Sequence, residues 1–493
     1  TLRLHYENDE LNGNDETTMA LWRFNGSVWT SSGKTGNSTS ANYVEQSGLT
    51  DLTNSWTCSD QSNVVQWNGS VSSNWNTAAN WTVLAGPASA PPSATDIVNL
   101  GTVAFTNQPS ISSTVTVKNI NFGSAQAVAL SLSSGGTLTS GDIHGSWSSD
   151  LTHSININDQ TMMVNGDLML SHGMNGRDIN IGIGSGSLTV NGVLTQSGAA
   201  SIVFNGAGQL NLSHNFNHIS GDFTAGNGTV MFSGGENQDL GAVTYHHLII
   251  NKSGAEAFIN SPTTITGNLT IMAGELDNTT IATIKGNVLI ESGATLENLN
   301  LMHVEGNWTN NGNFSASGAN IYFDGTGTQY ISASTFNNLN INKPVGSSAI
   351  LTGDVGIKDN LTVLSGTFNI KTFNCNRTIQ GGKITLADSA TFIVGANNSP
   401  LNFSEGTLAT SSTVIADGVG AQYIFGVDFG NLIFRNGGLK TLVSPIIVKG
   451  NLTIEAAARF DAGAETLTLL GNWNNEGSFV PSASTINMAG TGK

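Results

Sequence analysis

The chain has 493 residues, of which only 10% are charged, and its 17 basic and 34 acidic residues give a formal net charge of −17. This balance argues against a nucleic-acid-binding protein, which needs a basic face to neutralise phosphates. It also argues against a helical protein, because the charged residues that favour helices are scarce and the 59 glycines disfavour them. No apolar run approaches the roughly 18 residues of a membrane-spanning helix, so no transmembrane segment is predicted.

Residues 1–62 carry the pattern of a few short strands. The segment from Leu21 to Trp29 predicts a β-hairpin around Asn25-Gly26, because Asn-Gly favours tight two-residue turns. The segment Asn54–Thr57 predicts a closing strand. We interpret residues 1–62 as the C-terminal part of a β-sandwich (Ig-like) module.

Residues 63–100 differ in composition from what precedes and follows them. Trp67, Trp75 and Trp81 are followed by three prolines between positions 87 and 92. An architecture of stacked repeats exposes an apolar end that must be covered. We therefore interpret residues 63–100 as a linker and the N-terminal cap of a repeat domain.

Residues 101–493 contain internal repeats with a long period. The phrase Asn-Leu-Thr followed by an apolar residue begins at Asn268, Asn360 and Asn451, and 360 − 268 = 92 while 451 − 360 = 91. A second phrase, in which a glycine precedes a glutamine by four residues, keeps the same order and nearly the same spacing. Phrases that recur in one order at one period indicate stacked structural units. The glutamine phrase occurs at Gly234 and Gln238, at Gly325 and Gln329, and at Gly418 and Gln422.

A shorter repeat of about 20 residues lies inside the long one. Gly267, Gly286 and Gly306 each begin a Gly-Asn-apolar step, with spacings of 286 − 267 = 19 and 306 − 286 = 20. Alternating apolar residues after each step, such as Leu269 and Ile271, predict strands with one buried face. A unit of this size cannot bury its apolar face alone, but it can do so when stacked on copies of itself.

The sequence therefore predicts an all-β chain in which residues 101–493 form a right-handed parallel β-solenoid (β-helix) of about 20 turns. We expect asparagines at equivalent corners to form hydrogen-bonded ladders, which satisfy turn groups without charge. These asparagines are Asn268, Asn287, Asn307, Asn451 and Asn472. Because the chain begins at Thr1 without a signal peptide and ends at Lys493 inside a repeated phrase, we expect a solenoid truncated within a longer polypeptide.

The repeat phrases resemble those of very large surface proteins of Bacteroidota. The resemblance rests on Gly306–Phe314, Asn320–Ile331 and Phe336–Lys343, with Gly471–Phe479 as a second copy of the first phrase. It implies secretion by the type IX route and display or release at the cell surface, with gliding-motility adhesins as the first members to consider. It also implies surface polysaccharide or other cell-surface ligands, and the secretion or motility machinery, as partners.

The N-terminal segments resemble parts of the same group of proteins. Residues Leu2–Gly13 and Leu21–Gly26 are similar to a β-sandwich module that those proteins contain. The stretch Trp67–Trp81 resembles the entry segment of autotransporter-like β-helices. Together with the repeats, the resemblance covers nearly the whole chain, and its motifs are specific for architecture more than for activity.

Two segments raise the question of a metal ion. Glu7–Glu10 with Asn14–Glu16 supplies hard oxygen ligands that suit calcium, and the alternative is a solvated loop. His214 and His218 lie four positions apart, so on a strand they share a face, but no third ligand follows at a recognisable spacing. Corner or surface histidines are the favoured interpretation, and no metal or cofactor site is assigned.

A catalytic role also has to be tested, because parallel β-helices often carry polysaccharide lyases or hydrolases. The candidates are Arg177-Asp178 and Lys358-Asp359, and both pairs fit corners of turns. Catalysis needs residues that break a repeat locally, whereas the regularity from 229 to 454 is maintained. Trp308 and Trp473, at matching positions, are sugar-stacking platforms if exposed and packing residues if buried, and their repetition favours packing.

We therefore predict no catalytic, cofactor-binding or metal-binding residues and a non-catalytic, extracellular, cell-surface protein. Its solenoid would act as a stalk for adhesion or gliding motility. The alternatives are a secreted carbohydrate-active β-helix enzyme and a filament or sheath subunit. The roles of Cys58 and Cys375, which lie too far apart to indicate a disulfide framework, stay open.

Overall fold

The chain is all-β, as the sequence predicts. The computed structural model describes residues 1–11, 14–24, 26, 29–86, 88–145, 148–171, 176–397, 400–424 and 426–490. Strands make up 53% of it, and the parallel strands form a β-solenoid of about 18 turns. No helix among these residues is long and apolar enough to span a membrane.

Two compact units divide the chain, one of Thr1–Gln209 with His218–Thr224 and one of Leu210–Asn217 with Ala225–Lys493. This division falls inside the segment that we expected to be one repeat domain. The boundaries predicted at residues 62 and 100 follow changes in local pattern, and they stay predictions.

Two small antiparallel sheets begin the first unit. Their shared core consists of Tyr6, Met19, Leu21 and Val44. Strands β2 and β3 pair with Phe24 opposite Trp29, as a hairpin requires, while Asn25 of its predicted turn lies outside the described residues. Assignment to a β-sandwich module stays a prediction. The sheets comprise β1 (Leu2–His5), β4 (Gly36–Ser38) and β5 (Tyr43–Gln46), and β2 (Met19–Phe24), β3 (Trp29–Gly33) and β6 (Ser55–Asp60).

The solenoid of the first unit starts within the segment that we interpreted as linker and cap. Strand β7 (Asn63–Trp67) pairs in parallel with β9 (Asp96–Leu100), and β8 (Trp81–Ala85) covers its other edge in antiparallel orientation. The rings of Trp75 and Trp81 pack edge to face with centroids 4.7 Å apart. Aromatic packing and an antiparallel edge strand therefore close this end of the parallel sheet. The sheet continues through β12 (Asn119–Phe122), β15 (Ile143–Gly145), β18 (Leu168–Met169) and β21 (Leu194–Gln196).

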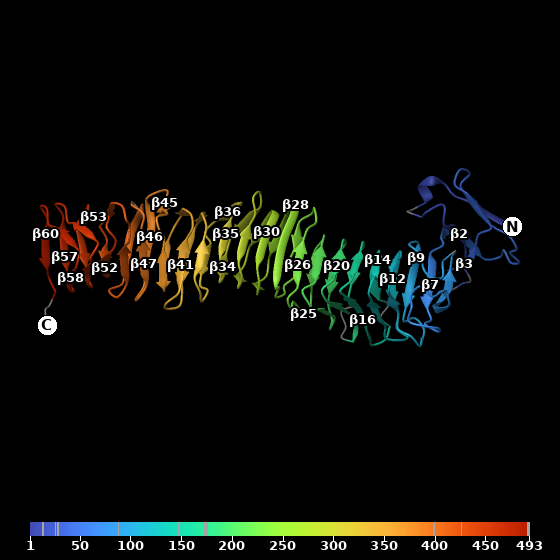
Figure 1. Cartoon of the computed structure of the whole chain (residues 1–493). Helices are drawn as coiled ribbons and strands as arrows, with labels where there is room; N and C mark the ends of the chain where they lie inside the picture. Colours follow the sequence, from blue (N-terminus) through green and yellow to red (C-terminus); the bar gives the residue numbers. More distant parts are fainter. Residues whose placement is uncertain are drawn as a thin grey trace. The chain divides into compact units, whose positions relative to one another are not determined.

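In the second unit, each regular turn contributes three strands, and successive turns lie side by side (Figure 1). One such turn is formed by β31 (Ala282–Ile284), β32 (Val288–Ile290) and β33 (Thr295–Asn298). The next is formed by β34 (Leu301–Val304), β35 (Trp308–Asn310) and β36 (Asn313–Ala316).

The register between turns confirms the period of about 20 residues. Leu269 of β30 (Leu269–Asn278) is the partner of Val288, which in turn is the partner of Trp308. These side chains are at most 1% exposed. Burial of such an apolar side chain contributes about 1.5–3 kcal/mol relative to exposure, so the column of equivalent positions forms a continuous core.

The predicted asparagine ladder exists, and its bonds run from backbone to side chain. The amide N–H of Asn287 donates to Oδ1 of Asn268 at 2.9 Å, and the N–H of Asn307 donates to Oδ1 of Asn287 at 2.8 Å. The same bond joins Asn472 to Asn451 at 3.0 Å. Each asparagine thus satisfies a corner donor of the following turn without any charge.

The glutamine phrase of the long repeat builds a buried clamp. Gln329 is 1% exposed, and its Nε2 donates to the carbonyl oxygens of Val304 (2.8 Å) and Gly306. Its Oε1 accepts bonds from the Gly325 N–H (3.1 Å) and from Nζ of the fully buried Lys343. The clamp therefore fixes a tight loop to the turn before it.

The long repeat places two more lysines in similar positions. Lys252 Nζ donates to the Glu236 carbonyl oxygen at 2.6 Å and to Gln238 Oε1, while Lys440 Nζ donates to the Gly418 carbonyl oxygen at 2.7 Å. Burial lowers the pKa of Lys252, Lys343 and Lys440 to about 8. The cause is the cost of keeping an ammonium group away from water.

The set of sheets that forms the wall of the solenoid changes within the second unit. Two sheets end and two others begin over a short stretch, while one sheet continues through β47 (Thr391–Val394), β49 (Thr413–Ala416) and β52 (Asn431–Phe434). Among the described residues, which omit 398–399 and 425 in this stretch, the wall of the solenoid is therefore interrupted on the remaining sides. The ending strands are β45 (Cys375–Arg377) and β48 (Phe403–Leu408), and the beginning strands are β50 (Gln422–Ile424) and β51 (Asp428–Phe429).

Replacement of the corner glycine Gly306 by alanine is expected to destabilise the stack by about 1–3 kcal/mol, because the new Cβ would lie 2.2 Å from the Gly286 carbonyl oxygen. Gly327→Ala is the matched control, since its Cβ would meet nothing within 4 Å. Thermal unfolding followed by circular dichroism compares the two variants. Equal midpoints would contradict close contact of the turns at this corner.

Lys343→Met tests the buried ammonium group through pH. The folded pKa is near 8 and the unfolded pKa near 10.5, so between these values the unfolded chain binds more protons and stability rises with pH. Raising the pH from about 7.5 to about 9.5 is therefore expected to stabilise the wild type relative to Lys343→Met. Calorimetric midpoints at both pH values measure the difference, with the exposed Lys285→Met as control. Parallel pH profiles would contradict a desolvated lysine.

Candidate functional site

The acidic residues near the N-terminus are used in local turns. Around η1 (Asn8–Glu10), Oε2 of Glu10 accepts the backbone N–H of Glu7 at 2.9 Å. Oδ1 of Asp15 accepts the N–H (2.9 Å) and the hydroxyl (2.7 Å) of Thr17, and these bonds lower the pKa of Asp15. These carboxylates shape the loop, and calcium binding by Glu7–Glu16 stays an untested alternative to a solvated loop.

His214 and His218, which the sequence places four positions apart, have different local contacts. The carbonyl oxygen of His214 accepts a hydrogen bond from Gln238 Nε2 at 2.7 Å. The His218 Nε2 lies 3.3 Å from the carbonyl oxygen of Gly221. Within the described part of the chain, neither histidine belongs to a group of three metal-ligating side chains.

Only one of the candidate catalytic pairs occupies a corner: Lys358-Asp359 lies in the bend after β42 (Val355–Ile357), whereas Arg177 and Asp178 begin the strand β19 (Arg177–Ile183). Arg177 Nε forms an ion pair with Asp150 at 2.9 Å, and the buried Asp178 accepts the N–H groups of Gly176 (3.0 Å) and Ala199 (3.2 Å). Lys358 Nζ donates to the carbonyl oxygen of Ala316 at 3.1 Å. These contacts account for the charges as anchors of turns.

Trp308 is a packing residue, as its repetition predicts. It is 1% exposed, and its ring lies 4.8 Å from that of Phe314 and 5.7 Å from that of Phe336, measured between centroids. Trp473 is the register partner of the buried Leu452 and is half-buried in the last described turn. Burial removes Trp308 as a sugar platform, and the ring of Trp473 packs edge to face on that of Phe479 with centroids 4.9 Å apart.

The cysteines are poor nucleophiles. Burial raises the pKa of Cys375 to about 12, and it also raises the pKa of the half-buried Cys58. The thiolate is the reactive form, so both side chains are inert near neutral pH.

A cluster of carboxylates that the sequence analysis missed lies on the outer face of the 21-stranded sheet, which contains β28, β30 and β33. Its residues come from three consecutive turns: Glu256 of β28 (His247–Ile259) is the partner of Glu275, and Asp277 is the partner of Glu297. Glu275, Asp277 and Glu297 each offer an oxygen within 4.8 Å of the other two. The signal was the near-equal spacing, 275 − 256 = 19 and 297 − 277 = 20, which matches the short repeat.

The electrostatics of this acidic cluster are unfavourable for the charged state. Desolvation, followed by the charges of Glu275, Glu297 and Glu256, raises the pKa of Asp277 to about 6, and desolvation also raises the pKa of Glu275. Oδ1 of Asp277 has no contact with solvent and, among the residues that the structure describes, no hydrogen-bond partner. Such an arrangement is relieved by a shared proton or by a hard divalent cation, for which carboxylate oxygens are the preferred ligands.

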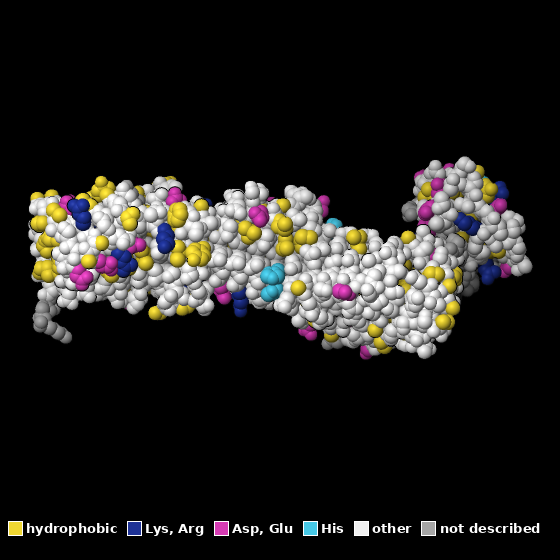
Figure 2. Space-filling model, viewed as in Figure 1, with side chains coloured by type: hydrophobic (Ala, Val, Ile, Leu, Met, Phe, Trp, Pro, Cys, Tyr) yellow, Lys and Arg dark blue, Asp and Glu magenta, His cyan; other side chains and the backbone are white. Residues whose placement is uncertain are grey.

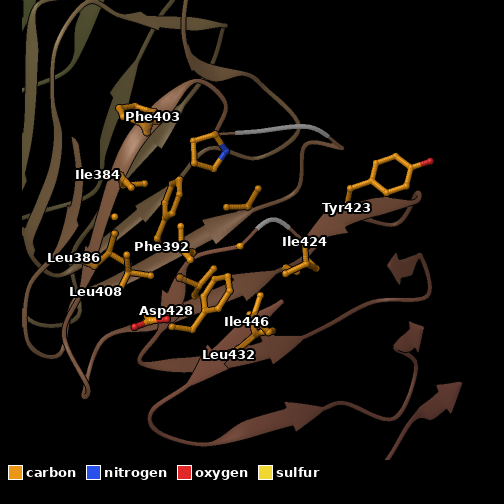
Figure 3. A pocket seen from close by; sticks show the side chains of 18 of the residues that line it. Ile384, Leu386, Phe392, Phe403, Leu408, Tyr423, Ile424, Asp428, Leu432 and Ile446 are labelled. Carbon is orange, nitrogen blue, oxygen red and sulfur yellow. The ribbon is translucent and has the colours of Figure 1, made fainter. Parts of the chain in front are cut away.

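A second site is an apolar cavity of about 900 Å³ at the interruption of the solenoid wall. Side chains from β46 (Gly381–Leu386), β47, β48 and β52 converge on it, among them Ile384, Phe392, Leu408 and Leu432 (Figure 3). Tyr423 lies at its side and points away from this group. Sequence reasoning missed the cavity because nothing in the repeat phrases marks where a strand of the wall is lacking.

The acidic cluster is tested by Asp277→Asn. Removing one charge is expected to raise the unfolding temperature in metal-free buffer at neutral pH by on the order of 2 °C, because repulsion falls. Millimolar calcium is expected to raise the unfolding temperature of the wild type but not that of the variant. Differential scanning fluorimetry measures both effects, with the exposed Asp388→Asn as control. An equal calcium response in all three proteins would exclude binding at this cluster.

Comparison of the chain with protein-family models, with curated proteins and with solved structures gives no match. The fold, the acidic cluster and the apolar cavity are therefore the observations from which function is inferred.

Proposed function

We propose that this chain is a non-catalytic structural and adhesive element of an extracellular surface protein, with the β-solenoid serving as a stalk. The observation that supports it is the in-register stacking of equivalent positions, such as Leu269, Val288 and Trp308. Every such position adds backbone hydrogen bonds and buried apolar area between turns. A structure of this kind resists extension and has no need of a reaction centre.

The chemistry of the surface supports a role in weak, repeated contacts. Neutral polar side chains and backbone cover most of the face seen in Figure 2, in keeping with the 10% of charged residues. Hydroxyl and amide groups suit the hydroxyls of surface polysaccharides, and many weak contacts add by multivalency. The net charge of −17 limits nonspecific attraction to anionic envelopes.

The resemblance of the repeats to Bacteroidota surface proteins supports a location at the cell surface. Under this proposal the chain is exported by the type IX route and acts with the adhesion or gliding machinery of the cell. Its partners are surface polysaccharides or other cell-surface ligands.

The acidic cluster is the observation that raises one alternative, a carbohydrate-active β-helix enzyme. Hydrolysis of a glycosidic bond uses two carboxylates that face each other across the scissile bond. The carboxylates of Glu275, Asp277 and Glu297 come from one sheet, and the residues that line the apolar cavity do not include them. This arrangement supports a surface cluster more than a catalytic cleft.

Binding and cleavage of polysaccharides distinguish the two functions. Beads that carry many copies of the chain are expected to adhere to an immobilised polysaccharide at least about 100-fold more strongly than the free protein, without release of new chain ends. The measurements are bead retention and the amount of reducing or unsaturated ends over a panel of neutral and acidic polysaccharides. Cleavage that is lost in Glu275→Gln would overturn the structural proposal in favour of an enzyme.

A further inference from the structure

The apolar cavity differs from the regular interior of the solenoid in being open to solvent. The inward-pointing side chains at the cavity range from 1% exposed at Leu386 to 9% exposed at Ile424, and other lining residues, such as Ser404, are exposed. The difference follows from the interruption, because β48 is the last strand of its sheet and β51 is the first of another. An apolar space of about 900 Å³ with an opening is of the size of a ligand site.

The shape of the cavity excludes an inserted strand. A Cβ on Gly406, in the middle of β48, would lie 3.1 Å from Cγ1 of Val427, so the two walls already meet there. A β-strand paired along the whole edge of β48 has no room at that point. The lining reaches solvent at the half-buried Phe403 and the 37% exposed Ile447, and we take this side as the mouth of the cavity. A narrow, flexible occupant that enters from this mouth fits the space.

The lining fixes the chemistry of the buried part of the ligand. Leu386, Phe392 and Leu408 present only hydrocarbon to the interior. The buried amide of Gln422 is occupied, because it accepts the Gly418 N–H (2.7 Å) and donates to the carbonyl oxygens of Val394 (2.9 Å) and Ala396 (3.0 Å). Polar groups on the part of a ligand that contacts Leu386, Phe392 and Leu408 would lose their hydration without compensation. The interior therefore suits an alkyl chain.

The mouth fixes the charge of the exposed part. Asp428 forms an ion pair with Lys449 at 3.3 Å, and Glu405 lies opposite Lys383 in the register of β46 and β48. Each acidic group at the mouth thus has a basic neighbour, so the rim favours neither an anionic nor a cationic head group. The exposed side chains of Asn402 and Ser404 offer neutral hydrogen-bonding groups.

We propose that this cavity binds the alkyl chain of a single-chain amphiphile with an uncharged polar head group. The hydrocarbon fills the interior beside Phe392 and Leu408, and the head group remains at the mouth beside Asn402 and Ser404. This site is independent of the adhesive role, because it lies at a break in the repeat and not on its regular faces.

Titration calorimetry with decyl maltoside below its critical micelle concentration tests the proposal on the whole chain. One molecule is expected to bind per chain, and each shortening of the alkyl chain by two carbons is expected to weaken binding about tenfold. Decyl sulfate and decyltrimethylammonium, with the same chain and opposite charges, are expected to bind more weakly. The proposal would be overturned if decyl maltoside did not bind, or if one of the charged amphiphiles bound more tightly than decyl maltoside.

Two tryptophan variants locate the site. Leu408→Trp fills the cavity from within, while Ser404→Trp blocks the mouth from an exposed position and leaves the core intact. Both are expected to weaken binding of decyl maltoside at least tenfold, whereas Val345→Trp, at a 94% exposed position outside the lining, is expected to leave it unchanged. If Leu408→Trp does not fold, Ser404→Trp carries the test. Unchanged affinity in folded Ser404→Trp, or displacement of the maltoside by a short apolar peptide, would contradict the proposed site.

Discussion

Each turn of this protein must place its backbone one strand spacing, about 4.8 Å, from the turn before it. At the corners this constraint is severe, because the backbone bends where the neighbouring turn is already in contact. Gly286 and Gly306 follow from it, since a Cβ at either position would overlap the carbonyl oxygen of the preceding corner. The asparagines that follow these glycines supply the acceptor that the next corner needs. A neutral amide does this repeatedly without like-charge repulsion, which explains how a chain with so few charges satisfies so many turns.

The repeats and one interruption of them give the molecule three distinct features. The glutamine clamps hold loops that would otherwise leave buried donors and acceptors unpaired. The acidic cluster arises because the register of stacked strands holds the carboxylates of Glu275, Asp277 and Glu297 close together despite their mutual repulsion. The apolar cavity arises because strands of the wall end before others begin, so the side chains of β47 and β52 lose their cover. The acidic cluster therefore lies within the regular stack, whereas the apolar cavity lies where the stack is interrupted.

The sequence was sufficient to predict what depends on local period. The spacing of Gly267, Gly286 and Gly306 predicted the turns, their parallel register and the asparagine ladder, because these features repeat and reinforce one another. The matching positions of Trp308 and Trp473 predicted packing, which the burial of Trp308 confirms. The acidic cluster was not predicted because Asp277 and Glu297 meet only in one register, and a shift of one residue would move the side chains to opposite faces. The cavity was not predicted because it lies where the described strands of two sheets end and those of two others begin, and no residue type marks that change.

The buried lysines have a consequence for experiments on the intact chain. Lys252, Lys343 and Lys440 each place a primary amine where solvent does not reach it, and each belongs to a different copy of the long repeat. Amine-acylating reagents modify a lysine only when its nitrogen is both exposed and unprotonated, so these side chains react only when their own segment opens. Acylation rates at the three positions, resolved by peptide mass spectrometry, therefore give a separate local opening rate for each repeat without any introduced label.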